Sequence, residues 1–420
     1  MSDLAIVLPC LNEGHNLGYL LPKIKEVIAT MAVEAEIYVI DGGSTDDTVD
    51  VARSQGVHVL SQRGTGYGGA IRTAFEDIRA TWLLTMDADF SHHPVFIKYL
   101  YARRNDAEIV IASRYMTQGY GEMPWTRKLL SGSLNWVFGR VLDINIRDLS
   151  SGFRLYHRNA IVNLKLQYDT YAVLQEILIK SYSQGYRVIE EPFHYLPRRH
   201  GSSHARVFKF GVVYLKALFT LWGLRNSIRS ADYDTRAFYS RIPLQRWWQR
   251  ERYRIIRDFT EDKMRILDSG CGSTQILNAV PQTIGMDVQH NKLRYMRRPA
   301  RALVNASIFD LPFCDASFEV IISSQVIEHV PESPAIFSEV ARCLEPGGIY
   351  ILGTPDYGRW QWPVIEKLYA FAQPNGYADE HITHYSLQSL QEHLKSHGFE
   401  IIAYKYILGA ELIIKAQKCS

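Results

Sequence analysis

The sequence predicts an α/β protein with two domains, and three observations lead to this prediction. A chain of 420 residues, 47% of them hydrophobic, is too long for one ordinary core and long enough for two. In each half, apolar strands alternate with helical segments, which is typical of a mainly parallel sheet covered on both faces. In each half, two strands also run directly into an aspartate, at the edge where open sheets bind ligands.

Cysteine usage and the start of the chain indicate the compartment. The five cysteines are odd in number, scattered, and form no Cys-x-x-Cys pair, which argues against a disulfide scaffold or a cysteine zinc site. The chain begins with Met1 and enters an apolar strand at once, without a secretory signal. The longest apolar stretch, 210–224, is interrupted by Lys216 and is shorter than the about 20 residues that a bilayer span needs. We expect a cytoplasmic protein without a transmembrane helix.

The first half alternates strands and helices from its beginning. Strands are expected at 4–9, 35–40, 57–60, 82–86 and 109–112, and helices at 17–30, 69–79 and after Pro94. Asn16 is expected to cap the first helix, and Asp46 or Asp47 the helix that follows the second strand. A glycine-rich loop at 64–69 opens a helix, but its spacing does not fit a dinucleotide fingerprint.

Two carboxylates one residue apart, Asp87 and Asp89, follow the apolar strand at 82–86. Taken alone, such a pair is more often two solvated loop acids or a helix N-terminal anion. Here the pair ends a hydrophobic strand with no basic residue nearby, so a hard divalent cation with oxygen ligands is its simplest neutraliser. Such a cation would in turn bind a diphosphate.

The motifs at 9–13, 41–46 and 87–94, in that order and spacing, resemble the family 2 glycosyltransferases, and among them the dolichyl- and polyprenyl-phosphate mannose synthases. The likeness covers roughly 4–225 and implies a Rossmann-like domain of GT-A type, a nucleotide sugar beside the 64–69 loop, and Mg²⁺ or Mn²⁺. It also implies a polyprenyl phosphate acceptor. By this resemblance the nucleoside pocket is lined by Pro9, Leu11, Glu13 and Asp41, the metal and diphosphate are held by Asp87 and Asp89, and Ser91 stands where some members have a metal-binding glutamine.

The same resemblance assigns further site residues. Arg114, together with the pair Arg127 and Ser131, would bind the acceptor phosphate, and the i, i+4 spacing places that pair on one helical face. The segment from Asp148 to Arg154 resembles the family's Asp-x-x-x-Gly-Phe-Arg motif. Gln175 and Glu176 match its polar pair near the donor sugar, and the loop that begins at Arg198 matches the one that closes over the diphosphate.

Between 197 and 257 the chain carries 12 Arg and 2 Lys against three acids, and aromatic residues such as Trp247 and Trp248 are interleaved. Such a region is typical of nucleic-acid binding or of an anionic membrane surface. A domain-packing helix with solvated arginines is the alternative. The apolar rhythm at 208–224 favours the membrane over a nucleic acid. We expect domains at 1–228 and 261–420, joined by a basic helical linker at 229–260.

The second half contains the pattern of an adenosine-binding site. A strand at 264–268 runs into the turn 269–273, and a second strand ends at Asp287, 19 positions after Asp268. This order is typical of a site for an adenosine-like ligand: a strand, a glycine turn, a helix, and a later acid that binds the ribose hydroxyls. NAD is the less favoured ligand, because no Gly-x-Gly-x-x-Gly follows Asp268.

The segments 310–313, 318–323, 326–330 and 344–348 resemble the class I S-adenosylmethionine-dependent methyltransferases over roughly 250–420. This implies a second Rossmann-like domain, with S-adenosylmethionine as cofactor. By the resemblance, the methionine end is bounded by Asp268, Gly270 and Gly272, the ribose binds Asp287, and the adenine faces Asp310. His329 is a candidate base or a structural residue, and His381 and His384 lie in a loop that could cover the acceptor.

The sequence thus predicts a bifunctional enzyme. One activity is the metal-dependent, inverting transfer of mannose or glucose from GDP-mannose or UDP-glucose to a polyprenyl or dolichyl phosphate. The other is methyl transfer to an unidentified acceptor. A phosphate acceptor, with a second pKa of about 6, is largely ionised at pH 7 and requires no strong base. The alternatives are transfer to a glycan or protein hydroxyl, with Asp148 as the first candidate base, and a non-enzymatic scaffold that binds nucleic acid or membrane. A peripheral position on the cytoplasmic face of a membrane fits sugar transfer to a polyprenyl or dolichyl phosphate.

Overall fold

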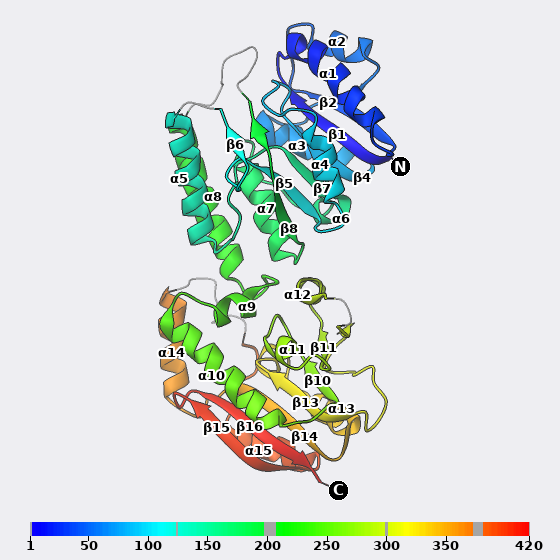
Figure 1. Cartoon of the computed structure of the whole chain (residues 1–420). Coiled ribbons are helices and arrows are strands. Elements are labelled where there is room, and N and C mark those ends of the chain that lie inside the picture. The colour runs from blue at the N-terminus through cyan, green and yellow to red at the C-terminus, as the bar shows by residue number, and fades with distance from the viewer. Residues whose placement is uncertain (1, 123–124, 197–206, 299–300, 373–380, 420) are drawn as a thin grey trace. The chain divides into compact units, whose positions relative to one another are not determined.

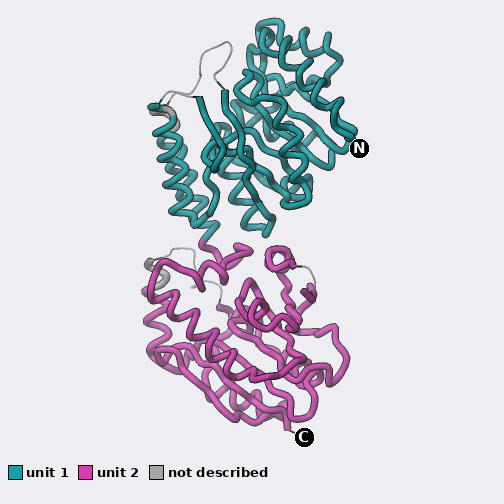
Figure 2. Tube along the Cα trace, viewed as in Figure 1, with its two compact units in different colours: residues 1–225 teal, residues 226–420 magenta. Residues whose placement is uncertain are grey.

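The computed structural model describes residues 2–122, 125–196, 207–298, 301–372 and 381–419. The chain divides into two compact units, unit 1 (residues 1–225) and unit 2 (residues 226–420), shown in Figure 2. Each unit has its own seven-stranded sheet with helices packed against it (Figure 1). The prediction of two α/β domains is confirmed.

The sheet of unit 1 has the strand order β3-β2-β1-β4-β7-β5-β8. Its strands are β1 (Ser2–Cys10), β2 (Ala35–Asp41), β3 (His58–Ser61), β4 (Ala80–Thr85), β5 (Ile109–Ser113), β7 (Arg154–His157) and β8 (Val188–Pro192). β7 runs antiparallel to β4 and β5, and the other neighbours are parallel. A separate small sheet pairs β6 (Tyr120–Gly121) with β9 (His194–Tyr195). The sheet is therefore mainly parallel, as predicted, with one reversed strand at its centre.

Alternate residues of β1 enter two different apolar layers. Leu4 and Ile6 pack in the layer of α1 and α4, whereas Ala5 and Val7 face the layer of α3 and α7. Because both faces of the sheet are buried, the strand is a continuous apolar run. The helices of unit 1 are α1 (Gly14–Ala29), α2 (Thr48–Ser54), α3 (Gly66–Asp77), α4 (Phe96–Ala102), α5 (Trp125–Val141), α6 (Arg158–Ile161), α7 (Val173–Ser183) and α8 (Val207–Asn226).

The prediction that Asn16 caps the first helix is wrong. α1 begins at Gly14, so Asn16 lies in its first turn, where Nδ2 donates to Oε2 of Glu13 at 2.6 Å. The loop after β2 supplies the acceptors for the first amide groups instead. Glu13 N donates to Thr48 Oγ1 at 2.9 Å, and Gly14 N donates to Asp46 Oδ2 at 3.2 Å. Capping groups that come from another loop cannot be predicted from the sequence next to the helix.

The sheet of unit 2 has the order β12-β11-β10-β13-β14-β16-β15, and only β16 runs antiparallel to its neighbours. Its strands are β10 (Ile266–Ser269), β11 (Ile284–Asp287), β12 (Leu303–Asn305), β13 (Phe318–Ser324), β14 (Leu344–Pro355), β15 (Phe399–Ile407) and β16 (Glu411–Lys418). Its helices are α9 (Tyr233–Phe238), α10 (Pro243–Thr260), α11 (Ile276–Ala279), α12 (His290–Met296), the short 3₁₀ helix η1 (Ile327–His329), α13 (Pro334–Cys343), α14 (Gln361–Ala372) and α15 (Leu387–Ser396).

The range 229–260, expected to link the domains, contains α9 and α10, and both belong to unit 2. Ile255, Ile256 and Phe259 of α10 are buried against the sheet. Arg252 forms hydrogen bonds of 2.5 and 2.7 Å with the buried carboxylate of Glu411. α10 is therefore a packing helix, and part of its basic charge is neutralised within the unit.

Candidate active sites

The loops after β1 and β2 are joined by hydrogen bonds. Asn12, which adopts a left-handed backbone (φ 56°), donates from its amide to Ser44 Oγ at 2.9 Å and accepts from Thr45 N at 2.8 Å. The carboxylate of Asp41 accepts from the amides of Gly43 and Ser44 at 3.1 and 3.2 Å. The pairing of β1 with β2 sets Cys10 opposite Asp41 and Pro9 opposite Ile40. Thus the segments that carry the predicted nucleoside residues Pro9, Leu11, Glu13 and Asp41 lie next to each other.

The two carboxylates after β4 have different surroundings. Asp89 is buried, and its Oδ1 accepts from the amide and the hydroxyl of Ser91 at 3.0 and 2.5 Å. The Asp87 side chain is 27% exposed. Phe90, between Asp89 and Ser91, has φ 64°, a left-handed conformation that costs a non-glycine residue energy and is concentrated at functional sites. Asp89 is therefore fixed by the turn, while Asp87 is partly exposed.

His92 packs beneath this turn and orients it. The ring is buried and stacks on Phe153 with centroids 4.9 Å apart, and its Nδ1 accepts from the amide of Asp87 at 2.9 Å. Burial lowers the pKa of His92, so the imidazole is neutral. His93 accepts from Val95 N at 3.2 Å. The two histidines therefore act as packing and capping residues.

Tyr67 was not identified from the sequence, although its glycine-rich loop was. The Tyr67 hydroxyl is buried and has no hydrogen-bond partner within the described ranges. A Cβ atom at Gly152 would lie 2.8 Å from this hydroxyl and 3.6 Å from Oδ1 of Asp87, so Gly152 gives both side chains room at one point. Burial, and next the charge of Asp87, raise the pKa of Tyr67. A buried donor without an acceptor beside a carboxylate fits a site for an oxygen-rich ligand.

Other glycines of this loop allow a second segment of the backbone to approach closely. A Cβ at Gly66 or Gly68 would collide with the backbone of 168–169, and Gly68 N donates to Asp169 O at 2.8 Å. Glu176 holds that backbone, because its carboxylate accepts from the amides of Gln167 and Tyr168. The loop is thus fixed against the segment before α7.

Arg114 and Asp148 form a buried ion pair. Arg114 donates from Nε to Oδ2 at 2.8 Å and from Nη2 to Oδ1 at 2.7 Å, and its backbone amide adds a third bond at 3.1 Å. Asp148 is fully buried and the Arg114 side chain is 9% exposed. Burial opposes the shift, but the charge and hydrogen bonds of Arg114 prevail and lower the pKa of Asp148.

Arg154 fixes the loop that contains Gly152. Its buried guanidinium donates to three backbone carbonyls, those of Leu149, Ser151 and Leu174, at 2.7 to 2.8 Å. Gln175 adds a bond from Nε2 to Leu149 O at 3.1 Å, while its buried Oε1 has no partner in the described part of the chain. The motif from Asp148 to Arg154 is therefore tied to α7.

Two predicted site residues, Arg127 for the acceptor phosphate and Arg198 for the loop over the diphosphate, are not placed. The side chain of Arg127, in α5, and the whole of Arg198 lie outside the described residues. The partner of Arg127 in the predicted pair, Ser131, is hydrogen-bonded through its hydroxyl to Tyr115.

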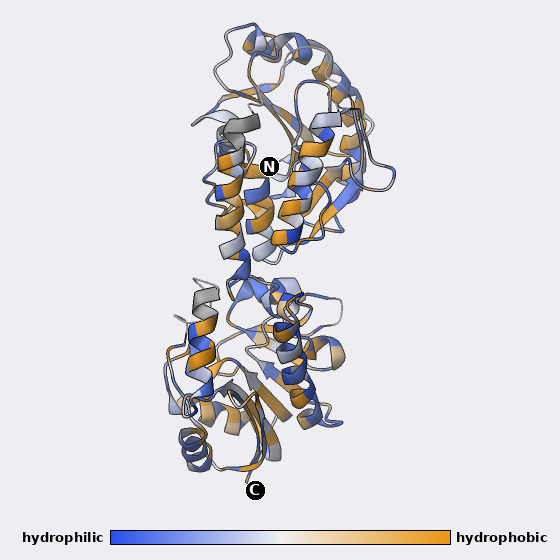
Figure 3. Cartoon of the chain, turned by 90° about the vertical axis from the view of Figure 1, so that its left-hand side faces the viewer, coloured by the Kyte–Doolittle hydropathy of each residue, from blue (hydrophilic) through white to orange (hydrophobic). Residues whose placement is uncertain are grey.

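α5 and α8 lie side by side (Figure 1), hydrophobic residues occur along both helices (Figure 3), and several of these residues are exposed. They contact through Phe138 and Tyr214, with ring centroids 6.2 Å apart. The side chains that face outward are Trp125, Leu129, Leu130 and Trp136 of α5 and Val212, Leu215 and Phe219 of α8, all at least 50% exposed. We call this set the apolar face. Among the helices that the structure describes, none combines the length and hydropathy needed to cross a bilayer.

In unit 2, the predicted cofactor residues meet at the carboxyl ends of β10 and β11. Gly270 and Gly272 adopt positive φ angles of 77° and 50° in the turn after β10. Asp287 accepts from Gly272 N at 2.8 Å and from Gln289 N at 2.7 Å. Asp310 is exposed in the loop after β12, the next strand of the sheet. These contacts hold the glycine turn beside Asp287, the residue predicted to bind the ribose.

Asp268 lies among like charges. Its Oδ2 accepts from Thr274 Oγ1 at 3.2 Å. Burial, and then the charges of Asp287 and Asp234, raise the pKa of Asp268 to about 7. Three carboxylates against the single ammonium group of Lys292 leave an excess of negative charge, which is complementary to a ligand that carries positive charge.

Asp234 of α9 was missed by the sequence analysis because it lies in the range read as linker. Its Oδ2 accepts from Ser273 N at 2.9 Å and lies 3.5 Å from Lys292 Nζ. A Cβ at Gly272 would be 2.5 Å from the same oxygen. α9 is therefore docked on the glycine turn by residues 39 positions apart in the chain.

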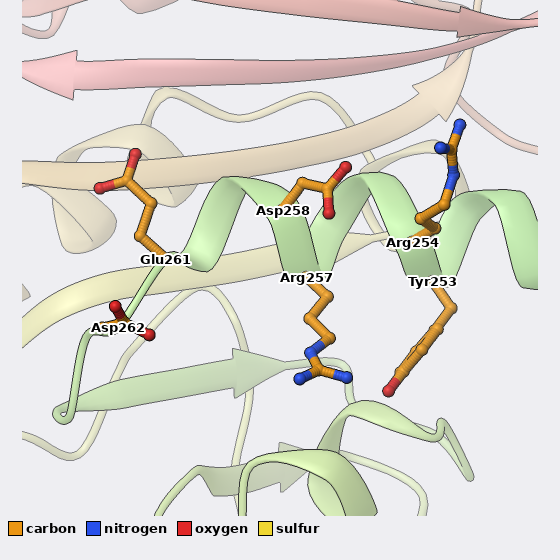
Figure 4. Close-up of a pocket in the computed structure, with 6 residues that line it drawn as sticks. All are labelled: Tyr253, Arg254, Arg257, Asp258, Glu261 and Asp262. Carbon is orange, nitrogen blue, oxygen red and sulfur yellow. The ribbon is translucent and has the colours of Figure 1, made fainter.

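A surface pocket of about 400 Å³ lies elsewhere, along the end of α10 (Figure 4). Its lining mixes basic and acidic side chains, namely Tyr253, Arg254, Arg257, Asp258, Glu261 and Asp262. It shares no residue with either candidate site.

Comparison with known proteins identifies both halves. Residues 5–164 match the sequence model of the family "Glycosyl transferase family 2", and residues 238–404 match that of the family "Methyltransferase domain". Glycosyltransferase AglJ of Haloferax volcanii is 30% identical over 201 residues, which are 47% of this chain and 64% of the relative. Polyprenol monophosphomannose synthase of Mycolicibacterium smegmatis is 28% identical over 243 residues, 54% of this chain and 89% of the relative.

Among solved structures, glucosyl-3-phosphoglycerate synthase from Mycobacterium tuberculosis, in complex with Mn²⁺ and UDP, is similar at 19% identity. The match covers 53% of this chain and 80% of that one, with a TM-score of 0.43. The sequence matches are the firmer finding, and they agree with the two motif sets described above. The chain joins a family 2 glycosyltransferase domain, which resembles polyprenol monophosphomannose synthase, to a methyltransferase domain.

Proposed function

We propose that unit 1 transfers mannose or glucose from a nucleotide sugar to a polyprenyl phosphate, with inversion at the sugar. The carboxylates of Asp87 and Asp89 carry this proposal, because they follow β4 directly, and Asp87 approaches Gly152 from the same side as the Tyr67 hydroxyl. Their all-oxygen donor set fits Mg²⁺ or Mn²⁺. When bound, such an ion stabilises a diphosphate leaving group as a Lewis acid.

In this proposal the side chains around the turn have distinct roles. Asp87 is the more accessible ligand, and Asp89 is the buried one. Ser91 holds Asp89 through two hydrogen bonds, so it acts as a positioning residue as well as a candidate ligand. The Tyr67 hydroxyl would donate to an oxygen of the donor diphosphate or sugar. Its burial makes such a hydrogen bond worth more than one in water.

The buried pair of Arg114 and Asp148 favours a phosphate acceptor over a hydroxyl. A hydroxyl acceptor needs a base, and Asp148 is a poor one, since it is fully buried, bidentately bound and has a lowered pKa. A phosphate monoester is already ionised at neutral pH and needs none. The resemblance to polyprenol monophosphomannose synthase supports the same choice.

The apolar face of α5 and α8 supports peripheral attachment to a membrane, where a polyprenyl phosphate resides. Two tryptophans and a phenylalanine, each at least 70% exposed, are residues that bind well in the interfacial region of a bilayer. The basic charge of residues 225–257 would add attraction to anionic lipid, reduced by the arginines that are paired within unit 2.

For unit 2 we propose methyl transfer from S-adenosylmethionine. The glycine turn, Asp287 and Asp268 lie together at the carboxyl ends of β10 and β11, and the two carboxylates would bind the ribose hydroxyls and the positive charge of the cofactor. The methyl acceptor is left open in this proposal.

The test is incubation of the full chain with a panel of labelled nucleotide sugars and acceptors, with and without S-adenosylmethionine. We expect a lipid-phosphate sugar from polyprenyl phosphate, dependent on Mg²⁺ or Mn²⁺. Transfer to glycan or peptide hydroxyls alone would overturn the lipid-phosphate proposal and favour the alternative. Absence of transfer with every pair, in a chain that binds duplex or single-stranded nucleic acid at stated salt, would favour the scaffold.

A further inference from the structure

Three side chains of unit 2 that could hold a metal ion meet after β13. Glu328 and His329 lie in η1, and His381 belongs to the segment before α15. One donor atom from each lies within 4.8 Å of the donor atoms of the other two. The imidazole rings of His329 and His381 are 4.9 Å apart. Two imidazoles and a carboxylate form a donor set that suits divalent transition metals better than Mg²⁺ or Ca²⁺.

Glu328 provides a buried carboxylate with an unused oxygen. The residue is fully buried, its Oε2 accepts from Thr354 Oγ1 at 3.3 Å, and its Oε1 has no hydrogen-bond partner among the residues described. The backbone carbonyl of Glu328 accepts from the amides of Ile382 and Thr383 at 2.8 and 3.1 Å. These bonds hold the segment of His381 beside η1. A buried, unpaired carboxylate oxygen is costly, and a cation would satisfy it.

The surroundings of His381 orient it as a ligand. The Tyr357 hydroxyl donates to Glu366 Oε1 at 2.7 Å, so its oxygen is left to accept from Nδ1 of His381 at 2.8 Å. Glu366 Oε1 itself lies 3.3 Å from Nδ1. This arrangement assigns the proton to Nδ1 and the lone pair to Nε2. Histidines that bind metals are usually held in this way, with the second nitrogen donating to an oxygen.

The cluster is close to the predicted cofactor turn. A Cβ atom at Gly270 would collide with the side chain of Val326, two residues before Glu328. β13 is also the direct neighbour of β10 in the sheet. The three donors therefore lie at the edge where the cofactor is expected to bind, on the side of β13.

We propose that Glu328, His329 and His381 bind a divalent transition metal that keeps open positions for an oxygen atom of the methyl acceptor. Ligands about 2.1 Å from Zn²⁺ in a tetrahedral arrangement stand about 3.4 Å apart, so donors that lie within 4.8 Å of one another would approach by at most about 1.4 Å on binding. The part of this proposal that concerns an acceptor oxygen depends on the proposed methyl transfer, whereas the part that concerns metal binding does not.

Zn²⁺ is the probe, measured by competition against a chelating dye in the full chain. All proteins carry Asp89→Ala, so that the carboxylates of unit 1 do not contribute. We expect one equivalent of tightly bound Zn²⁺, weakened at least tenfold by His381→Ala and by Glu328→Gln. Tyr357→Phe removes only the hydroxyl that contacts Nδ1 of His381, and it should weaken Zn²⁺ affinity about 10- to 100-fold. The matched control is His393→Ala, because His393 also pairs with a glutamate, Glu332, at 2.8 Å but lies outside the cluster.

S-adenosylmethionine affinity, measured on the same proteins, separates the possible failures. The site is supported if His381→Ala loses Zn²⁺ binding but keeps normal affinity for S-adenosylmethionine. Equal Zn²⁺ binding in the Asp89→Ala parent and in its His381→Ala variant, or a loss in His393→Ala instead, overturns it in favour of Zn²⁺ binding elsewhere on the protein. If His381→Ala fails to fold, the same comparison of Zn²⁺ affinity and S-adenosylmethionine affinity is made with Tyr357→Phe. Asp287→Ala should lose the cofactor and keep Zn²⁺, which distinguishes failure of the metal site from failure of the methyltransferase proposal.

Discussion

The guanidinium of Arg114 donates two parallel hydrogen bonds, at 2.8 and 2.7 Å, to the fully buried carboxylate of Asp148. Ser150 shares this carboxylate, donating from Oγ to Oδ1 at 3.1 Å. Breaking a buried pair by removing one charge is costly because the other charge is left uncompensated.

We predict that Asp148→Asn lowers the free energy of unfolding by about 3–5 kcal/mol, whereas Ser150→Ala costs about 1 kcal/mol. Denaturant titration, followed by a probe in unit 1, measures both. Because the pKa of Asp148 is lowered in the folded state, its contribution is present above the unfolded value of about 3.9 and is lost as the pH falls through the folded value. An Asn variant as stable as the wild type at pH 7 would show that the pair contributes nothing.

The Tyr67 hydroxyl leads to a second prediction. Since it has no partner in the described part of the protein, Tyr67→Phe should leave the melting temperature unchanged or slightly raised. If the hydroxyl binds a charged oxygen of the donor, its loss should lower kcat/KM about tenfold or more, as expected for about 1.5–3 kcal/mol. Tyr171→Phe is the control, because Tyr171 stacks on Tyr67 at 4.5 Å. Unchanged kcat/KM in Tyr67→Phe would remove Tyr67 from the site.

The pH dependence of cofactor binding forms a third prediction. The pKa of Asp268 is raised to about 7, so this carboxyl is protonated below pH 7 and charged above it. If its charge pairs with S-adenosylmethionine, affinity should rise as the pH increases from 6 to 8. Isothermal titration across that range measures this, and Asp268→Asn should bind weakly with a flat profile. A wild-type profile that is flat, or that falls with pH, contradicts the assignment.

The apolar face gives a fourth prediction. Phe219 is 71% exposed, whereas Trp222 packs on the core of unit 1. Phe219→Glu should therefore fold and lose binding to vesicles, while Trp222→Glu should destabilise the unit. Liposome flotation with anionic and neutral vesicles measures binding. The anionic component, about 1 kcal/mol per basic residue near the surface, should weaken with salt, because screening acts over about 10 Å at 0.1 M. Flotation of Phe219→Glu equal to the wild type would place the membrane contact elsewhere.

Local sequence patterns were sufficient for the strands that carry the sites. Continuous apolar runs predicted β1, β2 and β4, and the acids that end them were expected at one edge of the sheet. β7, by contrast, is four residues long and begins at Arg154, inside a motif read for function alone. Its antiparallel insertion between β4 and β5 follows from the chain returning across the sheet, which no local period encodes.

The contacts that the sequence did not reveal join distant segments. Asp234 reaches the cofactor turn from α9, and Tyr67 approaches Asp87 only because Gly152 lacks a side chain. The basic range that includes α10 was weighed as a membrane or nucleic-acid element, but Arg252 in it neutralises Glu411 of β16, 159 positions later. Charge counts along a chain do not show which charges are paired in space.

The most direct test of the account is sugar transfer by Asp89→Ala, measured beside S-adenosylmethionine affinity in the same full-length protein. We predict that transfer and metal-dependent donor binding are abolished while S-adenosylmethionine affinity is unchanged, because Asp89 and the glycine turn after β10 lie in separate units. Asp287→Ala should give the reverse pattern. Unaltered transfer in Asp89→Ala would contradict the central claim that the carboxylates after β4 form the metal-dependent donor site.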